Sequence, residues 1–331
     1  MPANASPQLC EARFDPFTDR AVLIATKRRH RPTAPAICPG CHEEQTPPAV
    51  CVFPEGAPLD APGWTVRVVP NKFSCFSLAG SNQRYEISAG LNGIKDPAGR
   101  CEVLFESPHH THPIHARSPE EIVLCLRAMI SRYQAARSDS QARFWYAFKN
   151  LGKAAGGTLD HPHWQLYTLP FVPPAIQDRY QRAAQYFNKT GRSLYRDHFS
   201  AEAASGDRVV AASSHFLTFV PFAACCPFEI RIAPQRDSAD FSAMSAEELI
   251  DLGGVLRDAV ARLCAVHPDL AFNIELHTAS FEHSSSPWFC WHIAVIPRVT
   301  IHAGVELGLN VMVNHMAPEE AAARLRAASV G

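Results

Sequence analysis

Polar and apolar residues alternate along this chain in patterns that predict helices and strands in a repeated order. Ser118-Pro119-Glu120-Glu121 combines an N-cap serine, a proline at the first helical position and a glutamate that can close a capping box. This signal predicts a helix from residue 118 to about residue 136. Ser245-Ala246-Glu247-Glu248 repeats it, and apolar residues follow with helical spacing. A second helix should therefore extend to about Val266.

Each predicted helix is followed by two predicted strands. They cover residues 143–149 and 161–169 after the first helix, and residues 271–277 and 288–297 after the second. Ser118 and Ser245 are 127 residues apart, and so are Pro170 and Pro297. The constant spacing predicts a duplicated α+β unit of antiparallel sheets flanked by helices. We expect an N-terminal unit over residues 1–212 and a C-terminal unit over residues 213–331.

Two further segments complete the predicted organisation. Residues 171–212 are polar, with tyrosines and basic residues, and should form helix and loop packed over the core. Pro318-Glu319-Glu320 predicts a short helix that closes the chain at about Ala328.

The composition narrows the class of protein. The chain has 331 residues, 47% of them hydrophobic and 19% charged, which is enough for a large core. The net charge is −1, and the 31 basic and 32 acidic residues are spread along the sequence. This distribution argues against nucleic acid or a membrane as partner. Residues 1–8 lack the pattern of a signal peptide, and the eleven cysteines therefore fit reduced thiols. We expect a soluble cytoplasmic protein.

The segment His161-Pro162-His163-Trp164-Gln165 carries the strongest chemical signal. Alternate side chains of a strand share a face, so the two histidines and the glutamine should point one way. Pro162 and Trp164 should point the other way. Two imidazoles and an amide on one face suit nucleophilic chemistry at phosphorus. A histidine that is only a structural part of the strand is the alternative for His163.

Cys38-Pro39-Gly40-Cys41 has the spacing with which two thiolates bind one zinc ion. A redox pair and two buried thiols are alternatives. Zinc is favoured because several prolines surround the motif and no helical pattern follows it. The two missing ligands should be histidines, and the candidates are His109, His110, His112, His115 and His161.

Two segments could bind phosphate. Residues 148–158 end a predicted strand and continue into a loop with Gly152, Gly156, Gly157 and Thr158, in which backbone N–H groups can approach a phosphate. A flexible connection is the alternative for this loop. The basic cluster of Lys27, Arg28, Arg29 and Arg31 is either solvated surface or a source of phosphate contacts.

These segments together resemble the galactose-1-phosphate uridylyltransferase branch of the histidine-triad superfamily. The main match is Ala147-Phe-Lys-Asn-Leu-Gly-Lys-Ala-Ala-Gly-Gly-Thr-Leu-Asp-His-Pro-His-Trp-Gln165, and it covers both the loop and the histidines. Further blocks follow in family order: Asp15-Pro-Phe-Thr18, Cys38-Pro-Gly-Cys41, Pro70-Asn-Lys-Phe73, Glu106-Ser-Pro-His-His110, Pro227-Phe-Glu-Ile230 and Gly304-Val-Glu-Leu-Gly308. The resemblance implies tandem histidine-triad-like units. Ser213-Ser-His-Phe-Leu217 and Asp251-Leu-Gly-Gly254 also resemble plant phosphorylases that act on ADP-glucose.

The resemblance assigns roles to individual residues. It implies a zinc ion held by Cys38, Cys41, His110 and His161, and this closed shell of four protein ligands indicates a structural metal. It also implies that His163 attacks the α-phosphorus of a nucleotide sugar to form a covalent nucleotidyl-histidine, with Gln165 donating to phosphate oxygens. The substrate-binding residues it implies are Arg28, Arg31, Asn71, Asn150, Thr158 and Glu306.

The chain departs from the family pattern at the positions of a second metal site and at Trp164, and its two units differ from each other. Ser193, Asp237 and Cys290 stand at positions of a second metal site, so we expect one zinc per chain. Trp164 replaces a small residue and is expected to fill the core. In the second unit, Cys290 and His292 stand where the first has His163 and Gln165, which predicts one catalytic centre per chain.

The expected reaction is the transfer of a nucleoside monophosphate, UMP by default, from a nucleotide sugar to a sugar 1-phosphate in galactose metabolism. UDP-glucose and galactose 1-phosphate are the default pair. One alternative is an NDP-sugar phosphorylase that uses inorganic phosphate, with ADP-glucose as candidate donor. Another is a catalytically silent nucleotide-binding protein. Because members of the resembled family are commonly dimers, a homodimer is also expected.

Overall fold

The computed structural model contains one large and one small antiparallel sheet in the part of the chain that it describes. That part comprises residues 10–26, 28, 37–59, 63–76, 84–87, 92–95 and 98–329. The large sheet is built from β3 (Cys51–Phe53), β4 (Val66–Pro70), β7 (Arg100–Phe105), β8 (Phe144–Leu151), β9 (His163–Leu169), β10 (Val209–Ala212), β11 (Phe216–Phe219), β12 (Ile230–Pro234), β13 (Phe272–His277) and β14 (His292–Pro297). The small sheet comprises β1 (Cys10–Phe14), β2 (Ala21–Ala25), β5 (Arg84–Ile87) and β6 (Asn92–Lys95).

Six α-helices accompany these sheets in the described residues. They are α1 (Pro119–Arg137), α2 (Pro174–Thr190), α3 (Leu194–Ser205), α4 (Ala246–Val266), α5 (Gly304–Leu309) and α6 (Pro318–Ala327). The predicted capping boxes are present at Ser118 of α1 and Ser245 of α4, where side chain and backbone bond reciprocally. The helices predicted near residues 118, 245 and 318 are therefore confirmed. None of the described helices is long and apolar enough to cross a membrane.

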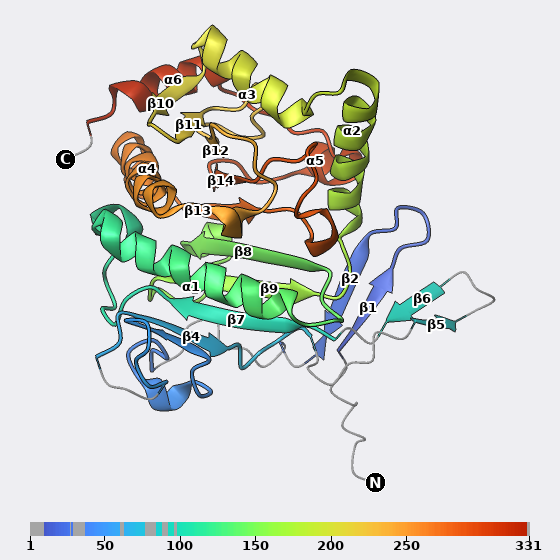
Figure 1. Ribbon diagram of the computed structural model, residues 1–331, viewed down its shortest axis with the longest axis vertical. Coiled ribbons are helices and arrows are strands. Elements are labelled where there is room, and N and C mark those ends of the chain that lie inside the picture. The colour runs from blue at the N-terminus through green and yellow to red at the C-terminus, as the bar shows by residue number, and fades with distance from the viewer. Residues whose placement is uncertain are drawn as a thin grey trace.

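The order of strands in the large sheet reveals the duplication. It runs β10-β11-β12-β14-β13-β8-β9-β7-β4-β3, so the halves meet where β13 pairs with β8 (Figure 1). The α+β fold class and the antiparallel pairing are confirmed. The division of the chain at residue 212 stays a prediction.

The two faces of the sheet differ in what covers them. Helices α1 and α4 lie side by side over one face (Figure 1), above a core that includes Trp145 and Trp291. Trp164 is buried in the same core, as expected for a residue pointing away from His163. On the opposite face, α2 and α3 cover the second half of the sheet: Phe199 of α3 packs there beside Phe219. These two helices occupy most of the segment 171–212.

Two strands begin later than expected. The strand predicted from residue 161 begins at His163, and the one predicted from residue 288 begins at His292. His161 therefore lies in the loop before β9. Within β9, His163 and Gln165 share a face, as strand alternation requires.

Candidate functional site

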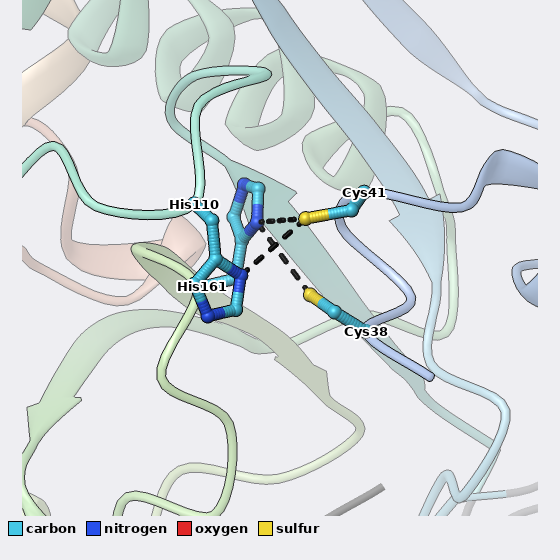
Figure 2. A group of neighbouring side chains, drawn as sticks. All are labelled: Cys38, Cys41, His110 and His161. Carbon is cyan, nitrogen blue, oxygen red and sulfur yellow. Dashed lines mark hydrogen bonds between the residues drawn. The ribbon is translucent and has the colours of Figure 1, made fainter. Parts of the chain in front are cut away.

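Four side chains from three separate segments form one cluster of metal-ligand type (Figure 2). Cys38 and Cys41 come from the proline-rich turn, His110 from the loop after β7, and His161 from the loop before β9. One ligand atom from each residue lies within 4.8 Å of those of the others. The sulfurs of Cys38 and Cys41 are each 3.6 Å from His161 Nδ1, and Cys41 Sγ is 3.4 Å from His110 Nδ1.

These separations suit a tetrahedral zinc ion. With zinc–sulfur and zinc–nitrogen bonds of ordinary length, a tetrahedral angle separates sulfur from nitrogen by about 3.6 Å. Two thiolates and two imidazoles fill all four positions, which leaves no place for a water or a substrate. The donor set thus fits a structural zinc that ties the N-terminal turn to the loop before β9.

The surroundings of His161 orient its ring toward the two cysteines. Its Nε2 donates to the carbonyl of Ser107 at 2.7 Å, which leaves Nδ1 as the atom for a metal. Burial lowers the pKa of His161, so the imidazole is neutral, as a ligand must be. Gly40 lies directly against the ring, because a Cβ at this position would lie 2.5 Å from its Cγ. The glycine of the Cys-Pro-Gly-Cys motif is therefore required by this packing.

His163 is held in the tautomer that a nucleophile requires. Its Nδ1 lies 2.8 Å from the carbonyl oxygen of His161, and because that oxygen can only accept, Nδ1 carries the proton. The lone pair of the neutral imidazole is then on Nε2. The contact also couples His163 to His161, the residue that faces the two cysteines.

Two cavities adjoin His163. One, of about 210 Å³, is lined by Asn71, Thr158 and Gln165 together with His163. The other, of about 160 Å³, is lined by Asn150 and the glycine loop, again with His163. Five of the predicted catalytic and substrate-binding residues therefore share one region.

The glycine loop differs from the expected phosphate cradle. The backbone N–H groups of Ala155, Gly156 and Gly157 donate to carbonyls within the loop itself. Positive φ angles at Gly152 and Gly156 permit this tight turn. The loop therefore contributes to the larger cavity through residues 158 and 159 rather than through those three amides.

Arg28 reaches the site through a tyrosine. Its Nη1 donates to the Tyr167 hydroxyl at 3.3 Å, and this hydroxyl donates to Gln165 Oε1 at 3.4 Å. With its oxygen occupied in this way, the Gln165 amide group can turn its N–H₂ toward a ligand. Arg31 lies outside the described residues, as do Lys27 and Arg29.

Comparison with known proteins identifies the family. A model of the galactose-1-phosphate uridyl transferase N-terminal domain matches residues 61–173, and the model of the C-terminal domain matches residues 179–330. The chain belongs to the galactose-1-phosphate uridylyltransferase family. This family consists of nucleotidyltransferases, so the chain is a member of an enzyme family.

Relatives in this family have two different names. ADP-glucose phosphorylase of Arabidopsis thaliana is 29% identical over 99% of this chain and 94% of its own. Galactose-1-phosphate uridylyltransferase of Thermotoga maritima is 24% identical over 97% and 99%. Among solved structures, a uridylyltransferase superposes with a TM-score of 0.82 at 26% identity, covering 96% of this chain and 97% of that one. The A. thaliana ADP-glucose phosphorylase with bound ADP-glucose gives 0.78 at 28%, covering 96% and 99%.

A residue of the second half supports the site of this family member. Asn273 of β13 lies opposite Asn150 of β8, and its Nδ2 donates to Asn150 Oδ1 at 2.7 Å and to the Ala155 carbonyl at 2.9 Å. Arg298 Nε donates to Asn273 Oδ1 at 2.6 Å. Sequence reasoning missed this contribution, because only the pairing of β8 with β13 brings these residues together.

A buried ionic cluster behind His163 was also missed. Lys149 and Arg117 both bond the Glu106 carboxylate, the arginine at 2.9 Å, and all three side chains are at most 3% exposed. Burial favours the neutral acid, but the two cations outweigh it and hold the pKa of Glu106 below its usual value. Lys149 Nζ also donates to the His163 carbonyl at 3.5 Å. The cluster therefore fixes the backbone of His163 from the α1 side of the sheet.

Glu306 has a different environment. Its carboxylate accepts from the backbone N–H of Ala303 at 2.9 Å and so caps α5. Within the described part of the chain, it is not among the residues that line the two cavities at His163. Its contact with a sugar stays a prediction.

The positions named for a second metal site surround an arginine. Arg196 Nε donates to Asp237 Oδ1 at 2.8 Å, and its Nη2 lies 3.8 Å from Cys290 Sγ. The backbone N–H of Arg196 donates to Ser193 Oγ at 3.3 Å. A cation of the chain itself thus lies among these three side chains.

Among the described residues, one further group of metal-ligand type is present. It consists of Cys225, Cys226 and Glu229. The Glu229 carboxylate already accepts from the Cys225 backbone N–H at 2.7 Å and from Arg231 at 3.1 Å. Its oxygens are thus engaged within the chain, and the arginine supplies the local positive charge.

Proposed function

We propose that this chain transfers a nucleoside monophosphate through a covalent intermediate on His163. Nε2 attacks the α-phosphorus of a nucleotide sugar, an N–P bond forms, and the bond to the departing sugar phosphate breaks. An acceptor phosphate then attacks the same phosphorus and the N–P bond breaks. The observation that carries the proposal is the position of His163 between two cavities, with its tautomer fixed by the His161 carbonyl.

The residues around His163 can stabilise the charge that develops on the phosphate. Gln165 lines the larger cavity and can donate its amide N–H₂ to phosphate oxygens. Thr158 lines the same cavity with a hydroxyl, and Asn150 lines the smaller one. Arg28 acts on Gln165 through Tyr167. We assign Asn71 to the bound nucleotide because it lines the larger cavity.

The mass of the intact chain provides the test. The protein is incubated with a panel of UDP-, ADP- and GDP-sugars, and a gain of one nucleoside monophosphate identifies both the intermediate and the base. His163→Ala should gain no mass. A wild-type chain that forms no adduct with any donor would instead support a silent nucleotide-binding protein.

The acceptor separates two candidate activities. A uridylyltransferase that accepts a hexose 1-phosphate is one candidate, since several relatives bear that name. An ADP-glucose phosphorylase is the other, favoured by the 29% identity to the A. thaliana enzyme over almost the whole chain. The isolated nucleotidyl-protein is offered galactose 1-phosphate or inorganic phosphate. The acceptor that discharges it faster decides between them.

The proposed zinc has a structural role. Cys38, Cys41, His110 and His161 would hold the ion, which supplies no chemistry to the reaction because its four positions are filled. We expect one zinc per chain by elemental analysis, and two would contradict this assignment. Cys38→Ser should lose the metal.

A homodimer is part of the proposal. Segment 301–313 exposes a run of large apolar side chains, with Ile301 at 93% and Leu307 at 73% exposed, and such a surface is typical of an interface. Glu306 lies on this segment. Light scattering should give twice the mass of the chain, and a monomer would refute the assignment.

We also propose a cytoplasmic location. All eleven cysteines lie in the described part of the chain, and none of them forms a disulfide there, as is usual in a reducing compartment. Cell fractionation tests this location.

A further inference from the structure

Two buried thiols lie beside the site without a role in the proposed reaction. Cys75 lies in the turn after β4, and Cys101 lies in β7. Their sulfurs are 3.5 Å apart, and each residue is only 4% exposed. A third thiol, Cys10, donates to the Cys75 carbonyl at 2.8 Å. Cys75 and Cys101 therefore face each other within reach of bond formation.

This pair is connected to Gln165 through one tyrosine. Cys101 lies directly opposite Tyr167 in the pairing of β7 with β9. The Tyr167 hydroxyl donates to Gln165 Oε1 at 3.4 Å and accepts from Arg28 at 3.3 Å. Only Tyr167 therefore separates the two sulfurs from the Gln165 amide, which is proposed to bind phosphate.

The environment makes one of the two sulfurs nucleophilic. A hydrogen bond from Cys101 lowers the pKa of Cys75 to about 7, and the positive charge of Arg28 contributes, although burial opposes the shift. Burial raises the pKa of Cys101, which therefore stays a thiol. One thiolate beside one thiol is the arrangement from which a disulfide forms most readily.

We propose that Cys75 and Cys101 form a redox modification site that hydrogen peroxide converts to a disulfide. The Cys75 sulfur attacks one peroxide oxygen, the O–O bond breaks, and sulfenic acid and hydroxide result. The Cys101 sulfur then attacks the Cys75 sulfur, the S–S bond forms, and the hydroxyl group leaves as water. In sum, two thiols lose two electrons and two protons, and one peroxide becomes two waters. Peroxide is small enough to reach sulfurs that are closed to bulkier reagents.

The disulfide would alter the site in two ways. The two sulfurs must close from 3.5 Å to about 2.05 Å. This closure pulls on the turn 71–76, of which Asn71 and Phe73 line the larger cavity. Oxidation also removes the negative charge next to Arg28, which positions Tyr167 and thereby Gln165. Resting on the proposed function, the expected consequence is slower nucleotidylation of His163.

The first experiment tests the modification independently of any nucleotide. The full-length, zinc-containing protein is titrated with hydrogen peroxide, then denatured, alkylated and mapped by mass spectrometry. A Cys75–Cys101 crosslink, lighter by two hydrogens, should form before Cys264 is modified, because the half-buried Cys264 has a raised pKa and contacts His115 rather than another sulfur. In Cys101→Ser, dimedone added together with denaturant after the peroxide treatment should trap Cys75 as a sulfenic acid. If Cys264 is oxidised while Cys75 and Cys101 stay reduced and are found alkylated, the proposed modification site is wrong. A crosslink between Cys10 and Cys75 would refute the pairing of Cys75 with Cys101.

The second experiment measures the effect on the reaction. The rate of nucleotide transfer to His163 in a single turnover should fall about tenfold or more after oxidation, since displacements of about 1 Å cost this much or more. Dithiothreitol should restore the rate, and Cys75→Ser, which lacks the sulfur that attacks peroxide, should keep its rate after peroxide treatment. Zinc content is measured in parallel, so that oxidation of Cys38 and Cys41 is not mistaken for oxidation of Cys75 and Cys101.

If the oxidised and the reduced protein transfer the nucleotide at the same rate, the link between the disulfide and Gln165 is refuted. If the reduced protein forms no adduct with any donor, the proposed function fails, while the crosslink still decides the modification site.

Discussion

The two halves of the large sheet place matching strand positions in opposite environments. In the first half, Asn150, His163 and Gln165 line cavities of about 210 and 160 Å³. The positions 127 residues later carry His277, Cys290 and His292, and these lie under α2 and α3. The same framework is thus open in one half and covered in the other.

Aromatic side chains close the second half. The cavity beside His277 and His292 has a volume of about 10 Å³, with Tyr180 and Tyr195 among its lining residues. This is room for one water at most. The rings of His277 and His292 stack at 4.8 Å, and burial holds the pKa of His292 well below its usual value. A side chain on this sheet can therefore reach a ligand only where its strand position also borders a cavity, as the positions of the first half do.

The largest expected effect is on formation of the nucleotidyl adduct, when a histidine of the first half and one of the second half are replaced in turn. His163→Ala should form no nucleotidyl adduct and should slow overall nucleotide transfer by about a thousandfold or more, as is typical for loss of a nucleophile. His292→Gln, which places in the second half the residue type found at position 165, should still form the adduct. Intact mass after a single turnover measures both. Equal loss in the two variants would contradict the assignment of one catalytic centre to the first half.

The buried cluster behind His163 provides the next test. Lys149 of this cluster corresponds, 127 residues later, to the buried Leu276. Glu106→Gln should lower the free energy of unfolding by about 3–5 kcal/mol, because two cations stay buried without their carboxylate. Lys149→Met should cost less, since Arg117 still pairs with Glu106. Urea denaturation measures the free energy of unfolding of each variant. If both variants lose the same free energy, Glu106 is not shared between Lys149 and Arg117.

The same carboxylate predicts a pH dependence. The pKa of Glu106 is lowered in the folded protein, so its contribution to stability is present at neutral pH and above its unfolded pKa. That contribution is lost as the pH falls through the folded pKa. Acidification should therefore destabilise the wild type more than Glu106→Gln, as measured by urea denaturation at a series of pH values. A parallel decline in both proteins would speak against a charged Glu106.

A smaller effect is expected at the cluster of Cys38, Cys41, His110 and His161. Gly40→Ala places a Cβ against the His161 ring and should weaken zinc binding about 10–100-fold, as disturbed surroundings of a ligand do. Gly254→Ala is the matched control, since a Cβ at this position in α4 meets nothing within 4 Å. Competition with a chelator measures both affinities. Unchanged zinc affinity in Gly40→Ala would show that the ring can move without cost.

The smallest effect concerns the link between Arg28 and Gln165. The second half has Ala294 at the position matching Tyr167, so this hydroxyl belongs to the first half alone. Tyr167→Phe removes one hydrogen bond on each side and should slow nucleotidylation roughly threefold to tenfold. Single-turnover rates at saturating donor provide the measurement. Tyr146→Phe, a neighbouring tyrosine on β8, is the control and should leave the rate near that of the wild type.

Sequence reasoning was most accurate where the signal is local. The capping boxes at Ser118 and Ser245 gave the starts of α1 and α4, because an N-cap and its partner lie three residues apart. Alternation in β9 placed His163 and Gln165 on one face and Trp164 on the other. The start of β9 was predicted two residues too early, since Pro162 lacks an N–H and His161 turns away to the cysteines.

Contacts between distant segments were not predictable in the same way. The Glu106–Lys149–Arg117 cluster joins three elements, and no spacing along the chain indicates that they meet. Asn273 reaches Asn150 only because β13 pairs with β8. The expected amide cradle in the glycine loop was replaced by hydrogen bonds within the loop, which sequence composition does not reveal.

The sequence alone determined the duplicated pattern of elements, the family resemblance and the set of residues expected at the site. These follow from local propensities and from motifs, which are properties of neighbouring residues. Only the tertiary structure decided that Cys38, Cys41, His110 and His161 converge, that Tyr167 links Arg28 to Gln165, and that α2 and α3 cover the second half. The reason is physical: long-range packing and strand pairing select which side chains meet and which face stays open.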